Sequence, residues 1–304
     1  MVESQAGQIW RRRARRQSDM DIETKFARRD LDVARDSTDA ALFQTPWGTH
    51  QPRGLQAALI WLTRATFLQR GDMRRWMTSV IRSLNAPMDI QFRGLKWRIE
   101  ARNNLIEYGL LTRPSYNGEE IDFLLGALAP GGTAIDIGCN IGLYALPLAN
   151  HAGPDGTVLA IDANPDMVTH VNFHATANSF SQLKGLNLAV GGKAAQVDLR
   201  IMRDDVAIVA VEESDSGSIA MRPLAEIISN HGVTQIDALK IDIEGHEDEA
   251  LAPFIETAPD SLLPKRIVIE FLPPSDYPGC AAAFAARGYR LVGRTRNNSM
   301  YARD

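Results

Sequence analysis

The chain has 304 residues, of which 45% are hydrophobic and 23% are charged, and its formal net charge at pH 7 is −4. This size and composition are typical of a soluble globular protein with one large α/β domain and a smaller appendage. A net charge so close to zero gives no indication of nucleic acid as a partner, and none is expected. No apolar segment approaches the roughly 18–20 residues that a membrane-spanning helix needs. The two cysteines, Cys139 and Cys280, are too few for a disulfide framework, so we expect a cytoplasmic protein.

Residues 1–50 show no sustained hydrophobic periodicity and are predicted to form a tail or a loosely attached arm. The segment 11–16 is a basic cluster, but no apolar segment follows it, so we do not expect a signal peptide. A solvated tail is the favoured interpretation, and weak association of this basic region with an anionic surface or with nucleic acid is the alternative.

Residues 51–129 are predicted to form a helical extension with one short hairpin. Leu55, Leu59 and Leu62 lie at i, i+4 and i+7, which predicts a helix with a leucine face. A second helix is expected to begin at Asp72, its N-cap, and to stop at Pro87. The apolar positions of this second helix are Met73, Trp76, Met77, Val80, Ile81 and Leu84.

The two predicted helices are rich in arginine. Residues 53–86 contain six arginines and a single acid, Asp72. A solvated face beside an ordinary packing stripe is the favoured interpretation. Contact with a membrane surface or with an anionic substrate is the alternative.

A hairpin and a third helix are predicted to complete the extension. The hairpin strands are expected at residues 90–93 and 96–99, with the turn at Gly94-Leu95. A helix over residues 119–128 then leads to the break at Pro130-Gly131-Gly132.

From Thr133 onward the pattern alternates between strand and helix, which predicts a mostly parallel, doubly wound sheet within a domain at residues 130–304. Strands are expected at residues 133–137, 158–162, 185–190, 238–243 and 266–271. Helices are expected at residues 142–150, 165–178, 223–230 and 247–255. Two hairpins complete the prediction, one inserted between residues 191 and 211 and one at residues 290–295 and 300–302, with a turn at Asn297-Asn298.

The segment 134–144 is typical of a nucleotide-binding turn, because an apolar strand ends in a glycine turn that opens a helix. Gly138 lets the backbone turn tightly and approach a ligand, and Gly142 lets the helix pack closely on its strand. The next strand ends in Asp162, 24 residues after Gly138. A carboxylate there can accept hydrogen bonds from both ribose hydroxyls, so we predict an adenosine ligand.

Two residues favour S-adenosylmethionine over a dinucleotide. A dinucleotide site requires three glycines and a helix N-terminus free for pyrophosphate, but Asn140 replaces the middle glycine. Asp136 would repel a phosphate, whereas it suits the sulfonium and ammonium groups of S-adenosylmethionine. An NAD-dependent oxidoreductase, or a catalytically silent protein that binds an adenosine ligand, remains the alternative. The expected cofactor-binding residues are Asp136, Gly138, Asn140, Gly142 and Asp162.

Ionisable residues interrupt the apolar strand at residues 238–243. Lys240, Asp242 and Glu244 share one face by period 2, and isolated charges are costly in a central strand. The favoured interpretation is a catalytic or acceptor-binding cluster. The alternative is a structural Lys240–Asp242 pair, with Glu244 capping the next helix.

The ends of two strands supply candidate groups for proton removal. His246 is the first candidate base because its unperturbed pKa lies near neutral pH, and Glu270 is expected to orient that histidine or the acceptor hydroxyl. Asp242, Glu244 and Glu270 can instead supply oxygen ligands for Mg²⁺, which is the less favoured alternative.

Three segments resemble the FkbM-type methyltransferases. Residues 135–144 resemble the first motif of that family, residues 239–247 resemble its most distinctive later motif, and residues 267–270 are similar to the following strand. The resemblance implies a class I, Rossmann-like methyltransferase fold with a seven-stranded sheet and an antiparallel C-terminal hairpin. It also implies S-adenosylmethionine as donor and a hydroxyl on a sugar, glycan or natural product as acceptor.

Overall fold

The computed structural model describes residues 42–84, 87–100, 104–201, 209–214, 216–270 and 277–304. The chain divides into two units, Met1–Thr45 and Pro46–Asp304. In the few described residues of the first unit, the Thr45 hydroxyl donates a hydrogen bond to the Leu42 carbonyl over 3.0 Å. All of the elements described below belong to the second unit.

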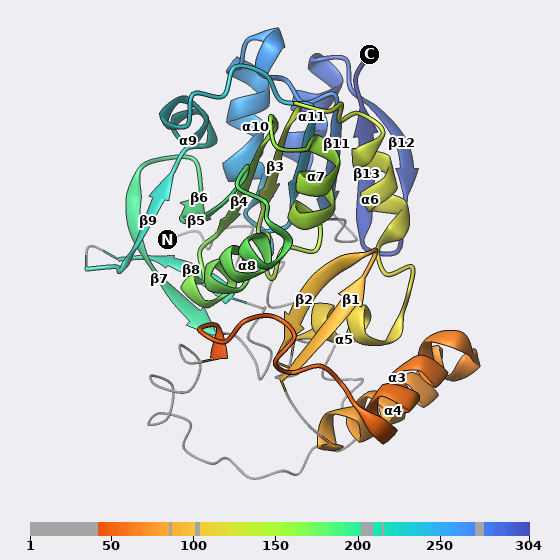
Figure 1. The fold of residues 1–304 in the computed structure, drawn as a ribbon. Helices are drawn as coiled ribbons and strands as arrows, with labels where there is room; N and C mark the ends of the chain where they lie inside the picture. The colour runs from red at the N-terminus through yellow and green to blue at the C-terminus, as the bar shows by residue number, and fades with distance from the viewer. Residues whose placement is uncertain (1–41, 85–86, 101–103, 202–208, 215, 271–276) are drawn as a thin grey trace. The chain divides into compact units, whose positions relative to one another are not determined.

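A seven-stranded sheet forms the centre of this unit (Figure 1). Its strands, in spatial order, are β12 (Arg290–Arg294), β13 (Asn298–Ala302), β11 (Arg266–Glu270), β10 (Ala238–Ile241), β3 (Thr133–Ile137), β4 (Thr157–Asp162) and β5 (Leu183–Asn187). The five strands from β11 to β5 are parallel, and β13 runs antiparallel to both β11 and β12. The expected class I sheet with an antiparallel C-terminal hairpin is therefore confirmed.

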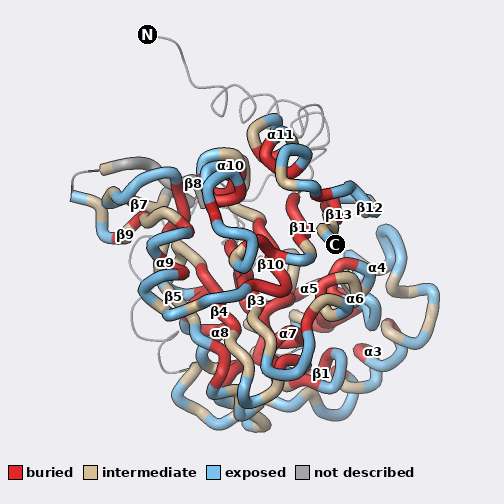
Figure 2. Tube along the Cα trace, turned by 90° about the horizontal axis from the view of Figure 1, so that it is seen from above, coloured by how far each residue is buried: buried red, intermediate tan, exposed pale blue. Residues whose placement is uncertain are grey.

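Helices cover both faces of the sheet (Figure 2). One face carries α6 (Gly118–Leu125), α7 (Ala145–Ala152) and α8 (Pro165–Asn178), and the other carries α9 (Leu224–Asn230), α10 (Glu247–Thr257) and α11 (Pro278–Ala286). Successive strand residues alternate between the two layers: Ala134 packs in the core under α7, whereas Ile135 packs in the core under α10. This alternation explains why the predicted strands are apolar almost throughout.

Several predicted ends of elements were wrong because glycine turns intervene. The helix expected to begin at Gly142 begins at Ala145, since Gly142 has a φ of 94° that a helix does not accommodate. The strand expected to reach residue 243 ends at Ile241, because Glu244 and Gly245 have φ values of 57° and 110°. Phe271, the predicted last residue of its strand, lies outside the described residues.

The single strand expected at residues 185–190 was also wrong. The Leu188 amide donates to the Asp162 carbonyl over 3.1 Å, and the chain leaves the central sheet there. A second sheet, ordered β6-β9-β7-β8, takes the following segments. Its strands are β6 (Ala189–Val190), β7 (Ala195–Ile201), β8 (Val209–Glu213) and β9 (Ile219–Arg222). Strands β7 and β8 pair antiparallel, so the predicted inserted hairpin is confirmed.

The extension contains both predicted helices, α3 (Gly54–Ala65) and α4 (Gly71–Leu84), joined by η1 (Phe67–Gln69). The predicted leucine face of α3 was wrong, because Leu55 is 65% exposed while Gln56 is buried. Gln56 tolerates burial because its amide donates to the Ile81 carbonyl at the end of α4 over 3.2 Å. Asp72 lies inside the first turn of α4 rather than at its N-cap.

The predicted hairpin forms from β1 (Met88–Phe92) and β2 (Leu95–Ile99). Its turn is Arg93-Gly94, one residue earlier than expected, with φ values of 51° and 77° at the two positions. Two residues with positive φ suit the right-handed twist of paired strands. Helix α5 (Leu105–Thr112) was not predicted, and α6 ends at Leu125 rather than at residue 128.

A buried ion pair holds the hairpin in place. The Arg98 and Asp89 side chains are fully buried, and Arg98 Nε lies 2.7 Å from Asp89 Oδ1. Burial acts against ionisation of Asp89, but hydrogen bonds from Arg98, His50 and Gly48 hold the pKa of this carboxyl below its usual value. Asp89 therefore stays charged, and its negative charge neutralises the buried guanidinium of Arg98.

Two general expectations concern covalent bridges and membrane spans. Cys139 and Cys280 are both buried and form no disulfide. Within the described residues, no helix combines the length and the hydropathy that crossing a bilayer requires.

Replacing Arg98 by methionine should lower the free energy of unfolding by about 3–5 kcal/mol, because Asp89 would be left as a buried charge. Urea denaturation followed by circular dichroism measures this loss. The matched control is Arg290→Met, which breaks the exposed pair between Arg290 and Asp304 and should have little effect. Equal losses in the two variants would contradict a structural role for the buried pair.

Candidate active site

The carboxyl ends of β3, β4, β10 and β11 meet at one edge of the sheet. The chain runs outward in opposite directions from β3, through β4 to β5 on one side and through β10 to β11 on the other. Ligands of open α/β sheets bind where the strand order reverses in this way. Most of the sequence-predicted site residues lie on the loops and strand ends at this edge.

The turn after β3 brings two loops into contact. The Gly138 and Cys139 amides both donate to the Ile161 carbonyl, over 2.8 and 3.1 Å. Gly138 has a φ of 72°, and a Cβ added to it would lie 1.8 Å from the Asp242 carbonyl oxygen. Only glycine fits at this position, because the loops after β3 and β10 touch there.

Asp162 ends β4 and accepts hydrogen bonds through both of its carboxylate oxygens. The Asn140 amide donates to Oδ2 and the Asn164 amide donates to Oδ1, each over 2.8 Å. Burial raises the pKa of Asp162 to about 6, and the two amides oppose that rise. Each carboxylate oxygen retains acceptor capacity, so the group can also receive the hydroxyls of a ribose.

Asp136 lies inside β3 and is almost completely buried. Its Oδ2 accepts a hydrogen bond from the Ala145 amide over 2.9 Å. Its Oδ1 is buried, and among the described residues none donates a hydrogen bond to it. Burial raises the pKa of Asp136 to about 7, while the nearby Lys240 ammonium lowers it. A buried acceptor of this kind fits a cationic ligand group such as an ammonium.

Three acidic side chains come together beyond β10 and β11. One carboxylate oxygen from each of Asp242, Glu244 and Glu270 lies within 4.8 Å of the other two. Glu270 is buried at the end of β11, whereas the other two are partly exposed. The predicted cluster of acids therefore exists as a spatial group.

The structural alternative for residues 240–244 was a Lys240–Asp242 pair with Glu244 capping the next helix, and the first part of it is confirmed. Lys240 is buried, and its Nζ lies 3.2 Å from Asp242 Oδ2. The N-cap position of α10 belongs to His246 rather than to Glu244. Glu247 ties down the loop before the helix, because its carboxylate accepts from the Ile243 amide over 2.7 Å and from the Gly245 amide over 3.0 Å. Glu247 is fully buried, and burial raises its pKa.

His246 occupies the N-cap position of α10 and is partly exposed. Its Nδ1 lies 3.8 Å from Glu249 Oε2, one turn along the helix. The acid paired with the ring is therefore Glu249, which was not among the residues predicted from the sequence. Glu270, expected to orient either the histidine or the acceptor hydroxyl, belongs to the group of three acids.

Two further residues position the cofactor loop and were missed. The Asn104 amide donates to Asn140 Oδ1 over 2.9 Å, from the N-cap of α5. His174 on α8 lies 3.0 Å from the Ile141 carbonyl and accepts from the Arg98 amide over 2.9 Å. Burial lowers the pKa of His174 to about 3, so the ring is neutral. Neither residue lies in a motif, so no sequence signal distinguishes them.

Known proteins with solved structures show only distant similarity to the chain. TYW2 of M. jannaschii, solved with AdoMet, is 12% identical, with 72% of this chain and 88% of that chain covered and a TM-score of 0.38. A SAM-dependent methyltransferase of Aquifex aeolicus is 17% identical, with 60% and 87% covered and a TM-score of 0.35. At these values the similarity carries no argument about function.

Sequence comparisons are more informative. Over 65 residues the chain is 37% identical to the ribosomal RNA large subunit methyltransferase E of Haloquadratum walsbyi. That match spans 21% of this chain and only 25% of the length of the curated relative. The model of the methyltransferase FkbM domain matches residues 136–291, which run from the end of β3 through the acidic cluster to the start of β12. The chain has the class I methyltransferase fold and belongs to the FkbM methyltransferase family.

Proposed function

We propose that this protein transfers a methyl group from S-adenosylmethionine to a hydroxyl oxygen of a small-molecule or glycan acceptor. The observation that carries the proposal is the group formed by Asp242, Glu244 and Glu270, at the sheet edge that the Gly138 turn adjoins. Carboxylates accept hydrogen bonds from hydroxyls, so this group suits an acceptor rich in hydroxyls.

The residues of the β3 and β4 loops fit the donor. Asp162 is positioned to accept the ribose hydroxyls, and the buried Oδ1 of Asp136 suits the ammonium of the methionine moiety. The same carboxyl would repel the phosphates of NAD, which argues against an oxidoreductase. When bound, S-adenosylmethionine supplies an electrophilic methyl group on a sulfonium.

Methyl transfer requires the chain to orient the acceptor hydroxyl and to remove its proton. Asp242, Glu244 and Glu270 hold the acceptor hydroxyl in line with the methyl, which lowers the entropic part of the barrier. His246, whose Nδ1 lies 3.8 Å from Glu249 Oε2, takes the hydroxyl proton as the new bond forms. Lys240 keeps Asp242 in position through their contact of 3.2 Å.

A second mechanism uses a divalent cation. The three carboxylates offer only oxygen donors, with one oxygen from each lying within 4.8 Å of the other two, and this donor set fits Mg²⁺. A cation held by them would lower the pKa of the acceptor hydroxyl. His246 is then dispensable, so the two mechanisms make opposite predictions for the same variant.

Replacing Asp162 by asparagine should weaken the binding of S-adenosylhomocysteine by roughly 1.5–3 kcal/mol, because the charge-assisted hydrogen bonds to the ribose are lost. Calorimetry measures the affinity, and Asp166→Asn, on an exposed residue four positions away, is the matched control. Because the pKa of Asp162 is raised to about 6, the affinity of the unaltered protein should fall as the pH drops below about 6. Unchanged affinity of Asp162→Asn at neutral pH would remove this carboxyl from the site.

Replacing His246 by alanine should reduce kcat about 10²- to 10⁴-fold and leave the affinity for S-adenosylhomocysteine unchanged, because a base acts only as the hydroxyl proton leaves. Methyl incorporation from labelled donor into a panel of polyhydroxylated acceptors gives the rate. His151→Ala, on the exposed histidine of α7, is the control. Full activity in the His246 variant would exclude the histidine mechanism.

Incubation with EDTA should leave the activity unchanged if His246 is the base. If the acids hold Mg²⁺ instead, the chelator should abolish methyl transfer, and added Mg²⁺ should restore it. The double change Glu244→Gln and Glu270→Gln should then also abolish the Mg²⁺ response. Loss of activity that Mg²⁺ does not restore would contradict both mechanisms.

A further inference from the structure

Large apolar side chains are exposed mainly on one part of the described chain. Seven of the nine exposed large hydrophobic residues belong to α3, η1 and α4, and the other two are Leu291 and Val292 on β12. The seven residues are Leu55, Trp61, Leu62, Phe67, Met73, Trp76 and Leu84. We call them the α3–α4 surface. Trp61, Phe67 and Trp76 are 61–69% exposed, which leaves most of each aromatic ring in contact with solvent.

These side chains are not merely the outer part of a packing stripe. On α4 the residues buried against the rest of the unit are Met77, Thr78 and Ile81. Met73, Trp76 and Leu84 lie along the neighbouring stripe of the same helix, at spacings of three and eight residues, and this second stripe is exposed. Isolated apolar residues on a surface need no explanation, but a concentration of them marks an interaction site.

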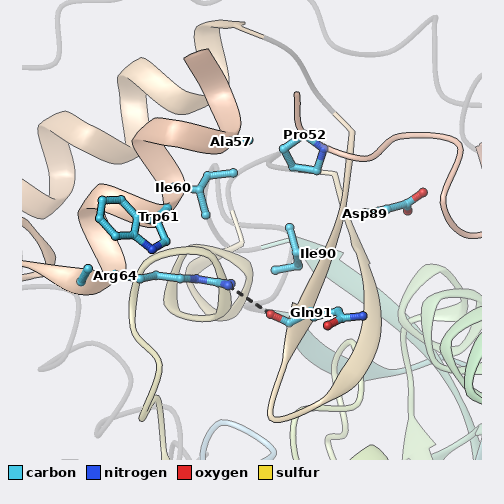
Figure 3. Close-up of a pocket in the computed structure, with 9 residues that line it drawn as sticks. Pro52, Ala57, Ile60, Trp61, Arg64, Asp89, Ile90 and Gln91 are labelled. Carbon is cyan, nitrogen blue, oxygen red and sulfur yellow. Dashed lines mark hydrogen bonds between the residues drawn. The ribbon is translucent and has the colours of Figure 1, made fainter. Parts of the chain in front are cut away.

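A cavity of about 430 Å³ opens beside Trp61 (Figure 3). It lies between α3 and β1, with Ile60 and Ile90 among its lining residues. Arg64 lines it too, but its guanidinium donates to the carbonyls of Leu111, Gln91 and Leu110 over 2.8–3.1 Å. The one cation of the cavity is thus already bonded, and the space offers mainly apolar contact.

The charges around the α3–α4 surface are mostly positive. Arg53, Arg70 and Arg75 are exposed, and the single acid of this part of the chain, Asp72, is exposed too and lies 3.3 Å from Arg75 Nη1. The whole chain, in contrast, has a formal net charge of −4. The positive charge is therefore local, and it accompanies the exposed tryptophans.

We propose that the α3–α4 surface binds the surface of an anionic lipid bilayer. Tryptophan, phenylalanine and leucine side chains enter the boundary between headgroups and acyl chains, and arginines pair with anionic headgroups. A second copy of the chain fits less well, because a symmetric dimer would place the arginines of one copy against those of the other. Nucleic acid would use the arginines but would leave Leu55, Met73 and Leu84 without a partner.

The inference is independent of the proposed reaction, because its readout is binding. The full chain is mixed with phosphatidylcholine vesicles that contain or lack phosphatidylserine, and vesicle flotation measures the bound fraction. We expect binding only to the anionic vesicles, with a decrease at high salt because the arginine contribution is screened. Equal binding to neutral vesicles, or none to either, would overturn the proposal.

Two double variants test the apolar and charged parts separately. Trp61→Ser with Trp76→Ser should abolish flotation, and Arg70→Gln with Arg75→Gln should weaken binding about ten- to thirtyfold. Leu291→Ser with Val292→Ser removes exposed apolar residues elsewhere and should leave flotation unchanged. Thermal melting checks that each variant folds. If the tryptophan double variant does not fold, the loss of binding in the arginine double variant tests the proposal. If the tryptophan change alters only the oligomeric state, or if single-stranded RNA displaces the protein from vesicles, the proposal is wrong.

Discussion

The contact between the Gly138 turn and the Asp242 carbonyl is the constraint on which the rest of the site depends. Because a Cβ at Gly138 would lie 1.8 Å from that oxygen, the loops after β3 and β10 can meet only through glycine. The contact joins the cofactor turn to the segment that carries Asp242 and Glu244. Glu247 fixes the same segment from the other end by accepting the Ile243 and Gly245 amides. The residues proposed to bind the donor and those proposed to bind the acceptor are thereby held by one connected piece of backbone.

The carboxylates at this edge of the sheet differ in the number of backbone amides that donate to them. Asp162 and Glu247 each accept two backbone amides, so the protein offsets the cost of burying their charge. Asp136 receives one amide and keeps a buried oxygen to which no described residue donates. Burial accordingly raises its pKa to about 7, higher than that of Asp162. A cationic ligand group beside Asp136 would restore its charge, so cofactor binding and ionisation of this carboxyl are linked.

The parallel centre of the sheet could be predicted from the sequence because β3, β4, β10 and β11 are apolar runs. The family resemblance implied the seven strands and the antiparallel C-terminal hairpin. The ends of elements could not be predicted, since they depend on positive φ values at residues such as Glu244. Burial on α3 was unpredictable because Gln56 is buried only where the Ile81 carbonyl accepts its amide. At the site, acids on neighbouring strand ends were predictable as a group. The pairing of His246 with Glu249 depends on the N-terminal geometry of α10, which spacing alone does not give.

Hydrogen bonds connect the extension to the turn after β3, and they do not depend on a group that titrates near neutral pH. His174 accepts from the Arg98 amide and therefore donates through Nδ1 to the Ile141 carbonyl, as a neutral ring. With its pKa lowered to about 3, protonation cannot break this bridge in ordinary conditions. Asn104 adds a second connection, from α5 to Asn140. Because Arg98 also anchors the hairpin through Asp89, the extension is held in a defined position relative to the cofactor turn.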